Sequence, residues 1–235
     1  MNLLNIDANA KTIKGQKRGY MTAVLYLAPY TSSGVNLCPM AKTAGCYEGC
    51  LNTAGRGGIA KDRAVFATDA GLLPDNNIQH ARIARSEFFN NMRDAFMAKL
   101  AKEIAAFIKK AERKNLTPVV RLNGTSDILW ETIPYGDHDS IMEAFPNLQF
   151  YDYSKVYKRA IRPLPDNYHL SLSYSQASQK YALATQTITR ECDVNLVVVF
   201  RGSLPETFLG RRVVNGDESD LRFLDEKNVI VGLKA

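Results

Sequence analysis

The chain contains an almost continuously apolar run, Met21-Thr22-Ala23-Val24-Leu25-Tyr26-Leu27-Ala28-Pro29. Runs of this kind are typical of strands that are buried on both faces, as in parallel sheets. Pro29 and the group Ser32-Ser33-Gly34 end the run. We therefore predict a buried strand here, followed by a loop at its carboxyl end.

Further apolar runs follow and alternate with helical patterns. The predicted strands cover residues 116–122, 148–153, 168–174, 194–200 and 229–233, and the predicted helices cover 79–114, 141–145, 156–161 and 178–191. Strands that alternate with helices indicate a parallel sheet with right-handed crossovers. Six units are fewer than the eight of a closed barrel. The predicted fold class is therefore α/β, either a partial (β/α) barrel or an open, mostly parallel sheet of about six strands.

Length and composition fit one α/β domain over residues 1–235, because 46% of the residues are hydrophobic. Residues 1–20 are polar and basic, and they predict an N-terminal arm, either a loop or a short hairpin. The sequence shows no membrane-length apolar run and no signal-peptide pattern, so we expect a cytoplasmic protein without a membrane partner. The net charge of +6 permits a phosphate-bearing partner without requiring one.

Three of the four cysteines lie in one loop after the first predicted strand. They are Cys38, Cys46 and Cys50, with the spacing C-x7-C-x3-C, and residues 31–60 form a predicted cysteine- and glycine-rich loop. Clustered cysteines in a cytosolic protein are more typical of metal binding or catalysis than of disulfides. Cys192 stands alone at the end of a predicted helix.

Three loop thiolates are compatible with more than one metal centre. A closed zinc site needs four nitrogen or sulfur ligands, usually in two close pairs, and the sequence offers no second pair. A 4Fe-4S cluster accepts thiolates from one loop, and three of them would leave one iron open to a cofactor or substrate. We expect such a cluster at Cys38, Cys46 and Cys50. Zinc, or buried cysteines without a metal, remain the alternatives.

Polar residues follow the other predicted strands. Because the carboxyl ends of parallel strands meet at one edge of a sheet, we expect this edge to be the functional face. Asp127 and Glu131 are paired carboxylates near it and are the candidate catalytic residues, although an Asp in such a place also commonly caps a helix. Lys155 and Lys158 lie beside tyrosines and are candidates for contact with a nucleic acid.

Two stretches resemble a phage family. They are the loop from Cys38 to Cys50 with the run Leu51-Asn52-Thr53-Ala54-Gly55-Arg56-Gly57, and the run Arg121-Leu122-Asn123-Gly124-Thr125-Ser126-Asp127. Together they are similar to the phage gene-product-eighty-eight family, and the resemblance covers most of the chain. It implies a phage or prophage origin, and hence the cytoplasm of a bacterial host, more than a particular activity.

The predicted architecture also resembles radical S-adenosylmethionine enzymes, which place three cluster cysteines after the first strand of a partial (β/α) barrel. This resemblance implies that Tyr47 and the turn Asn123-Gly124-Thr125 contact the cofactor. Ser126 and Ser173, which belong to the polar residues at the same edge of the predicted sheet, complete the predicted cofactor-binding set. In those enzymes the usual spacing is C-x3-C-x2-C, so the C-x7-C-x3-C spacing here is a departure from the pattern.

Three functions compete at this point. The first is an iron–sulfur enzyme that uses S-adenosylmethionine and an electron donor to act on a nucleotide or nucleic acid. The second is a non-enzymatic nucleic-acid-binding phage protein in which the metal braces the loop. The third is a hydrolase or transferase that uses Asp127 and Glu131. The first is our prediction, because it gives the three clustered thiolates a chemical role.

Overall fold

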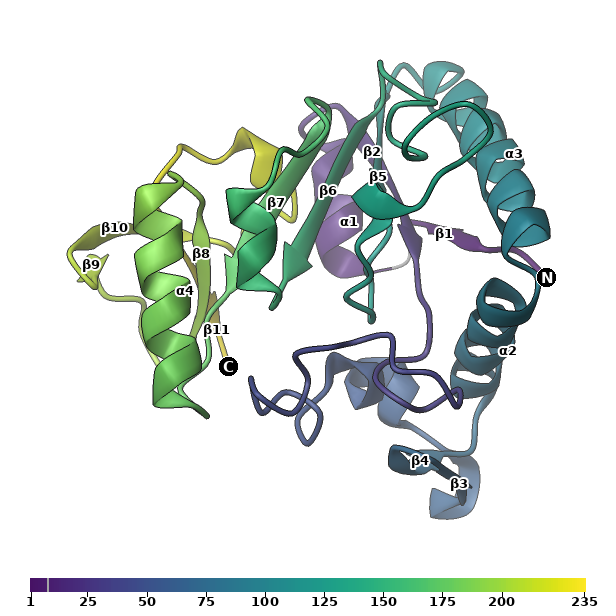
Figure 1. The fold of residues 1–235 in the computed structure, drawn as a ribbon, viewed down its shortest axis with the longest axis horizontal. Coiled ribbons are helices and arrows are strands. Elements are labelled where there is room, and N and C mark those ends of the chain that lie inside the picture. Colours follow the sequence, from purple (N-terminus) through teal and green to yellow (C-terminus); the bar gives the residue numbers. More distant parts are fainter. Residues whose placement is uncertain (8) are drawn as a thin grey trace.

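The apolar runs form strands of one sheet in a computed structural model, which describes residues 1–7 and 9–235. The strands of this sheet are β1 (Leu4–Ile6), β2 (Tyr20–Leu25), β5 (Thr117–Arg121), β6 (Gln149–Ser154), β7 (Tyr168–Ser173), β8 (Leu196–Phe200), β9 (Thr207–Phe208), β10 (Arg211–Asn215) and β11 (Ile230–Lys234). Their order across the sheet is β1-β2-β5-β6-β7-β8-β11-β10-β9 (Figure 1). A separate hairpin pairs β3 (Val65–Thr68) with β4 (Gly71–Pro74).

Six neighbouring strands, β2, β5, β6, β7, β8 and β11, are parallel and follow one another in chain order. Their carboxyl ends therefore lie along one edge of the sheet. β10 adds a further parallel strand, and the antiparallel β1 and β9 form the two edges, so the sheet is open. The predicted α/β class with an open, mostly parallel sheet is confirmed. The sheet is larger than predicted, because β1, β9 and β10 were not expected.

The described helices are α1 (Ala10–Gln16), α2 (Asn77–Asn91), α3 (Arg93–Glu112) and α4 (Gln179–Glu191), with 3₁₀ turns η1 (Leu51–Thr53), η2 (Gly55–Gly58), η3 (Lys61–Arg63), η4 (Trp130–Thr132), η5 (Tyr157–Ile161) and η6 (Arg222–Leu224). The prediction of one helix over 79–114 is wrong, because Met92 has non-helical backbone angles (φ −138°, ψ 57°) and separates α2 from α3. The bend lets Phe89 and Phe96 pack edge to face at 5.2 Å, so both helices contribute to the core.

The N-terminal residues also differ from the prediction of a loop or hairpin arm. β1 pairs with β2, and α1 begins at a capping box in which Asn9 and Thr12 exchange hydrogen bonds. The strand and the two-turn helix in this segment could not be predicted from its polar, basic composition. Both are too short to show a clear periodic pattern of apolar residues. Ala8, which the predicted arm includes, lies outside the described residues. Residues 141–145, expected as a helix, form turns.

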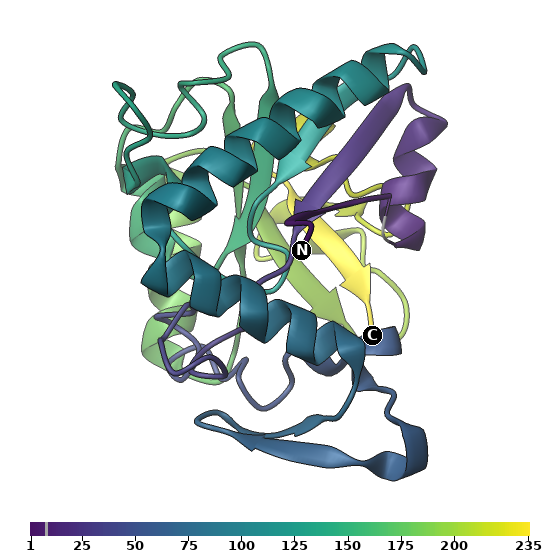
Figure 2. The same ribbon diagram turned by 90° about the vertical axis from the view of Figure 1, so that its right-hand side faces the viewer.

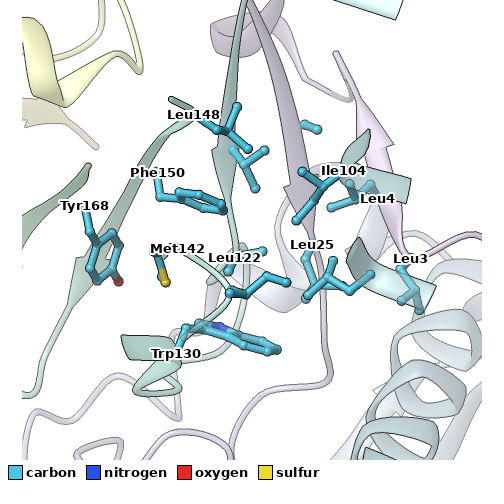
Figure 3. Packing of buried hydrophobic residues seen from close by; sticks show 14 of the residues in the cluster. Leu3, Leu4, Leu25, Ile104, Leu122, Trp130, Met142, Leu148, Phe150 and Tyr168 are labelled. Atoms are coloured by element: carbon cyan, nitrogen blue, oxygen red, sulfur yellow. The ribbon is translucent and has the colours of Figure 1, made fainter. Parts of the chain in front are cut away.

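The main hydrophobic core fills one face of the sheet. Side chains alternate across a strand, so Leu122 and Phe150 point to this face and pack with Leu25, Ile104 and Trp130 (Figure 3). Figure 2 shows α2 and α3 crossing this side of the sheet, with the β3–β4 hairpin projecting below them. Full burial of each large apolar side chain contributes roughly 1.5–3 kcal/mol, so this layer fixes the sheet beneath the helices.

A smaller layer covers the other face. Val119 and Tyr151 pack there with Leu221, which belongs to the segment between β10 and β11, and Leu221 also lies 3.7 Å from the position of a Cβ built on Gly15 in α1. Both faces of the central strands are therefore buried, which explains why apolar residues dominate them, although β6 and β7 also carry buried polar side chains such as Asp152 and Ser171. The carboxyl edge is left for the cysteine segment to cover.

Candidate metal centre

The cysteine segment lies across the carboxyl edge of the sheet. The chain leaves β2 at Leu25 and passes between α2 and the lower end of α4 (Figure 1). The Asp127 N–H donates to Leu37 O at 2.9 Å, and Ser175 Oγ donates to Ala44 O at 2.6 Å. These two hydrogen bonds attach the segment to the chain that follows β5 and to the chain that follows β7.

The three loop cysteines are half-buried and lie within electrostatic reach of one another. Burial raises the pKa of Cys38 to about 12, and the neighbouring thiols of Cys50 and Cys46 add to this increase. Burial also raises the pKa of Cys46 and of Cys50. Thiols in this state must release protons to bind a metal. Cys192 instead ends α4, at the edge of the sheet where β8 begins.

Two largely buried cations flank these thiols. Lys155 follows β6 and opposes the increase in the pKa of Cys46, and Arg82 of α2 does the same at Cys50. The hydrogen-bond acceptors of both cations are neutral, since Lys155 Nζ donates to Tyr174 O (3.3 Å) and Arg82 Nη1 donates to the backbone O (2.8 Å) and Oδ1 (2.6 Å) of Asn52. The Asp127 carboxylate is an anionic neighbour of Lys155, and both cations also favour the thiolate form of the adjacent cysteines.

The two kinds of metal centre make different demands on these side chains. Within residues 1–7 and 9–235, no three histidine, cysteine, aspartate or glutamate side chains meet in a group that could hold a single metal ion. A four-iron cluster makes a different demand, because each thiolate binds its own iron and the sulfurs surround the cluster instead of meeting at one point. Such a cluster with three thiolates is anionic, so the residues present fit it, with Lys155 and Arg82 as counter-charges.

The turn after β5 contacts the cysteine segment directly, not across a pocket. Asn123 uses its side chain within this turn, where Oδ1 accepts from Ser126 Oγ (3.0 Å), the Ile128 N–H (2.9 Å) and Trp130 Nε1 (3.2 Å). Thr125 Oγ1 donates to Leu27 O at 2.6 Å. The side chains of Asn123, Thr125 and Ser126 therefore hold the turn, and a ligand here would meet its backbone.

Asp127 and Glu131 are brought together by Arg159, which is fully buried. Arg159 Nε and Nη2 donate to the two oxygens of Glu131 at 2.8 Å and 2.6 Å, and Nη1 donates to Asp127 Oδ1 at 3.3 Å. Asp127 also accepts from Ser154 Oγ (2.7 Å) and the Lys155 N–H (2.7 Å). Asp127 therefore joins the β5 and β6 loops and does not cap a helix. Burial raises its pKa, and Arg159 opposes that increase.

The remaining two predicted cofactor residues lie apart from this turn. Tyr47 is 43% exposed, its ring centroid lies 6.0 Å from that of Tyr30, and its hydroxyl donates to Glu48 Oε1 at 2.8 Å. Ser173 ends β7, and its carbonyl accepts from the Tyr181 hydroxyl at 2.8 Å. Both belong to the carboxyl edge, but neither contacts the other predicted cofactor residues.

Comparison with known protein families matches residues 2–235 to the family described as Gene product 88. The chain belongs to the phage gene product 88 family. The curated proteins and the solved structures contain no match to it. The radical S-adenosylmethionine resemblance receives no support from these comparisons. No helix in the described part of this family member is both long enough and apolar enough to cross a bilayer.

Several residues of this gene product 88 site were not identified from the sequence. Arg82 gave no signal, because it lies in a helix that begins well after the cysteine loop. Arg159 is part of the short basic segment expected as a helix, and nothing local shows that it is buried between two carboxylates. Lys155 was noted only as a contact for nucleic acid. Its position directly after a buried strand was the available signal for a role at the centre.

Gly124→Ala should lower the free energy of unfolding by about 1–3 kcal/mol, the usual range for overpacking. A Cβ at Gly124 would lie 2.6 Å from a ring carbon of Tyr26 and 2.7 Å from Leu25 O. The matched control is Gly49→Ala in the cysteine segment, where a Cβ meets nothing within 4 Å. Urea unfolding of both variants is the measurement. Equal stability of the two variants would contradict a packing role for Gly124 and favour its predicted role as a cofactor contact.

Proposed function

We propose that this protein is a phage iron–sulfur enzyme that acts on a nucleotide or nucleic acid in the cytoplasm of a bacterial host. Cys38, Cys46 and Cys50 would hold a 4Fe-4S cluster and would leave one iron without a protein ligand. S-adenosylmethionine is the cofactor that would use this open position. One observation carries the proposal: the segment that holds all three cysteines covers the carboxyl end of the first of six sequential parallel strands, where hydrogen bonds attach it to the chain after β5 and after β7.

The position of the thiols supports this function over a structural metal loop. Ligands in a parallel α/β sheet bind at the carboxyl ends of the strands, which is where this segment lies. A cluster held by these cysteines would supply one-electron reduction of S-adenosylmethionine, which breaks its C–S bond to give methionine and a 5′-deoxyadenosyl radical, so an external electron donor would be a required partner.

The residues around the thiols have separate tasks in this proposal. Lys155 and Arg82 offset the negative charge of the thiolates. The backbone of the Asn123–Ser126 turn faces the cysteine segment, with Thr125 O 3.9 Å from Cys38 Sγ, and is the surface available to the methionine part of the cofactor. Asp127 and Glu131 remain the candidate acid/base residues. Because Arg159 holds both, their first task is to fix the β5 and β6 loops.

Anaerobic reconstitution with iron and sulfide tests the proposal. We expect a brown protein whose reduced cluster gives an electron paramagnetic signal that changes when S-adenosylmethionine is added, and we expect 5′-deoxyadenosine among the products. An intact cluster whose signal does not change, with no deoxyadenosine, would contradict cofactor use. A colourless protein with stoichiometric zinc would contradict the cluster itself and favour the nucleic-acid-binding alternative.

A further inference from the structure

Exposed basic side chains surround the cysteine segment. Lys42 lies within the segment, Lys158 follows β6 in η5, Lys180 lies in the first turn of α4 after β7, and Arg201 follows β8. Because these strands are parallel, the segments that carry these four residues all begin at the same edge of the sheet. We define these four residues as the basic rim.

Direct contacts connect three of the elements that carry the rim. A Cβ built on Gly45 would lie 2.5 Å from Cβ of Ala177, and Ser175 Oγ donates to Ala44 O, so the cysteine segment abuts the start of α4. The rings of Tyr157 and Tyr181 lie 5.8 Å apart, which joins η5 to the same end of α4. Lys158 and Lys180 are the sequence neighbours of these two tyrosines. Lys42, Lys158 and Lys180 are therefore carried by elements that pack against one another beside the cysteine segment, and Arg201 follows the next strand of the sheet.

An aromatic surface accompanies these charges. Tyr47 lies directly after Cys46, its ring is 43% exposed, and it packs against Tyr30, with Lys42 Nζ 6.0 Å from the centroid of the Tyr30 ring. The Tyr47 hydroxyl donates to Glu48, and Lys42 is the basic side chain near this aromatic pair. An exposed aromatic ring with a nearby basic side chain is a combination that binds an unpaired base together with its phosphate. The exposure of Tyr47 argues that its ring is available to a substrate base, whereas the resemblance placed it at the cofactor.

We infer that the basic rim and Tyr47 form a binding surface for single-stranded nucleic acid, so that the substrate is a polynucleotide and not a free nucleotide. The inference rests on the proposed function only for the chemistry that follows binding. Lys42 lies in the segment that abuts the start of α4, and the strands preceding the other three rim residues are β6, β7 and β8, which span two strand spacings. At about 4.8 Å per spacing this is roughly 10 Å, so the rim offers several cations along one edge, as a chain of phosphates requires.

Fluorescence anisotropy with a labelled oligothymidylate of about 20 nucleotides, titrated at several salt concentrations, tests the inference. The rim variant carries Lys42→Glu, Lys158→Glu, Lys180→Glu and Arg201→Glu. The control carries the same change in charge at Lys102, Lys109, Arg113 and Lys114, which are exposed in or just after α3. We expect the rim variant to lose at least about ten-fold in affinity and to show a smaller salt slope, by roughly 0.7 for each lost phosphate contact. The control should keep wild-type affinity.

Tyr47→Ser gives a second readout, measured without S-adenosylmethionine. We expect roughly a five- to hundred-fold loss of affinity, the range for one stacked base. Equal losses in the rim and control variants, no binding by the wild type, or equally tight binding of a duplex of the same length would each overturn the inference. The binding assay needs no cluster. A protein that binds the oligonucleotide but never forms deoxyadenosine therefore contradicts only the proposed function.

Discussion

Alanine in place of Cys38, Cys46 or Cys50 should yield a protein that stays colourless after reconstitution and holds less than about a tenth of the wild-type iron, whereas Cys192→Ala should keep the wild-type iron and colour. Each loop cysteine is expected to bind its own iron, so two remaining thiolates leave a cluster open at two positions. Cys192 is the matched control because it is also half-buried but lies at the opposite edge of the sheet.

The measurements for this series are the iron content, the sulfide content and the visible absorbance of the reconstituted proteins. Thermal melting of the metal-free proteins is the control for folding. The loop thiols are only half-buried, so we expect each alanine variant to change the free energy of unfolding by less than about 1 kcal/mol. Wild-type iron in Cys46→Ala would remove that residue from the centre. Loss of iron in Cys192→Ala would show that the fourth cysteine completes the ligand set, and an open iron would then have no basis.

The sequence was sufficient for the part of the fold that depends on continuous apolar runs. β2, β5, β6, β7, β8 and β11 were all anticipated, because strands buried on both faces are rich in apolar residues, even though β6 and β7 also include polar residues such as Asp152 and Ser171. β10 was not predicted, because its first two residues, Arg211 and Arg212, interrupt any apolar run. Arg211 is nevertheless buried, and its guanidinium donates to the carbonyls of Val194, Asn228 and Val229. Pairing of this kind across long chain separations leaves no local pattern.

The same limit explains what was missed at the candidate centre. Cys38, Cys46 and Cys50 are close in the sequence, so their proximity in space could be anticipated. Arg82 reaches Asn52 across 30 residues, and Lys155 reaches the thiols only because β6 ends beside the segment that follows β2. The charge environment of the thiols is therefore a tertiary property. It depends on which strands are neighbours and on how α2 packs against the cysteine segment.

Arg159→Met should lower the free energy of unfolding by about 3–5 kcal/mol, the usual cost of leaving a buried charge without its partner. Arg159 is fully buried and holds Asp127 and Glu131, which lie 32 and 28 residues away in the chain. The matched control is Arg162→Met, an exposed residue that ends the same 3₁₀ turn, with an expected change within about 0.5 kcal/mol. Urea unfolding measures both.

The loss should also depend on pH and on the carboxylates. Burial raises the pKa of Asp127 even with Arg159 present, and without Arg159 it should rise further. The folded variant then binds this proton more tightly than the unfolded chain does, so its stability falls as the pH rises above about 4 and through the folded pKa. The deficit relative to the wild type should therefore be larger near pH 7.5 than near pH 5.

Adding Asp127→Asn and Glu131→Gln to Arg159→Met should restore part of the stability, because no unpaired charge remains buried. If the triple variant is no more stable than Arg159→Met and the deficit is independent of pH, Arg159 acts through packing alone, and Asp127 and Glu131 are free to serve as acid and base.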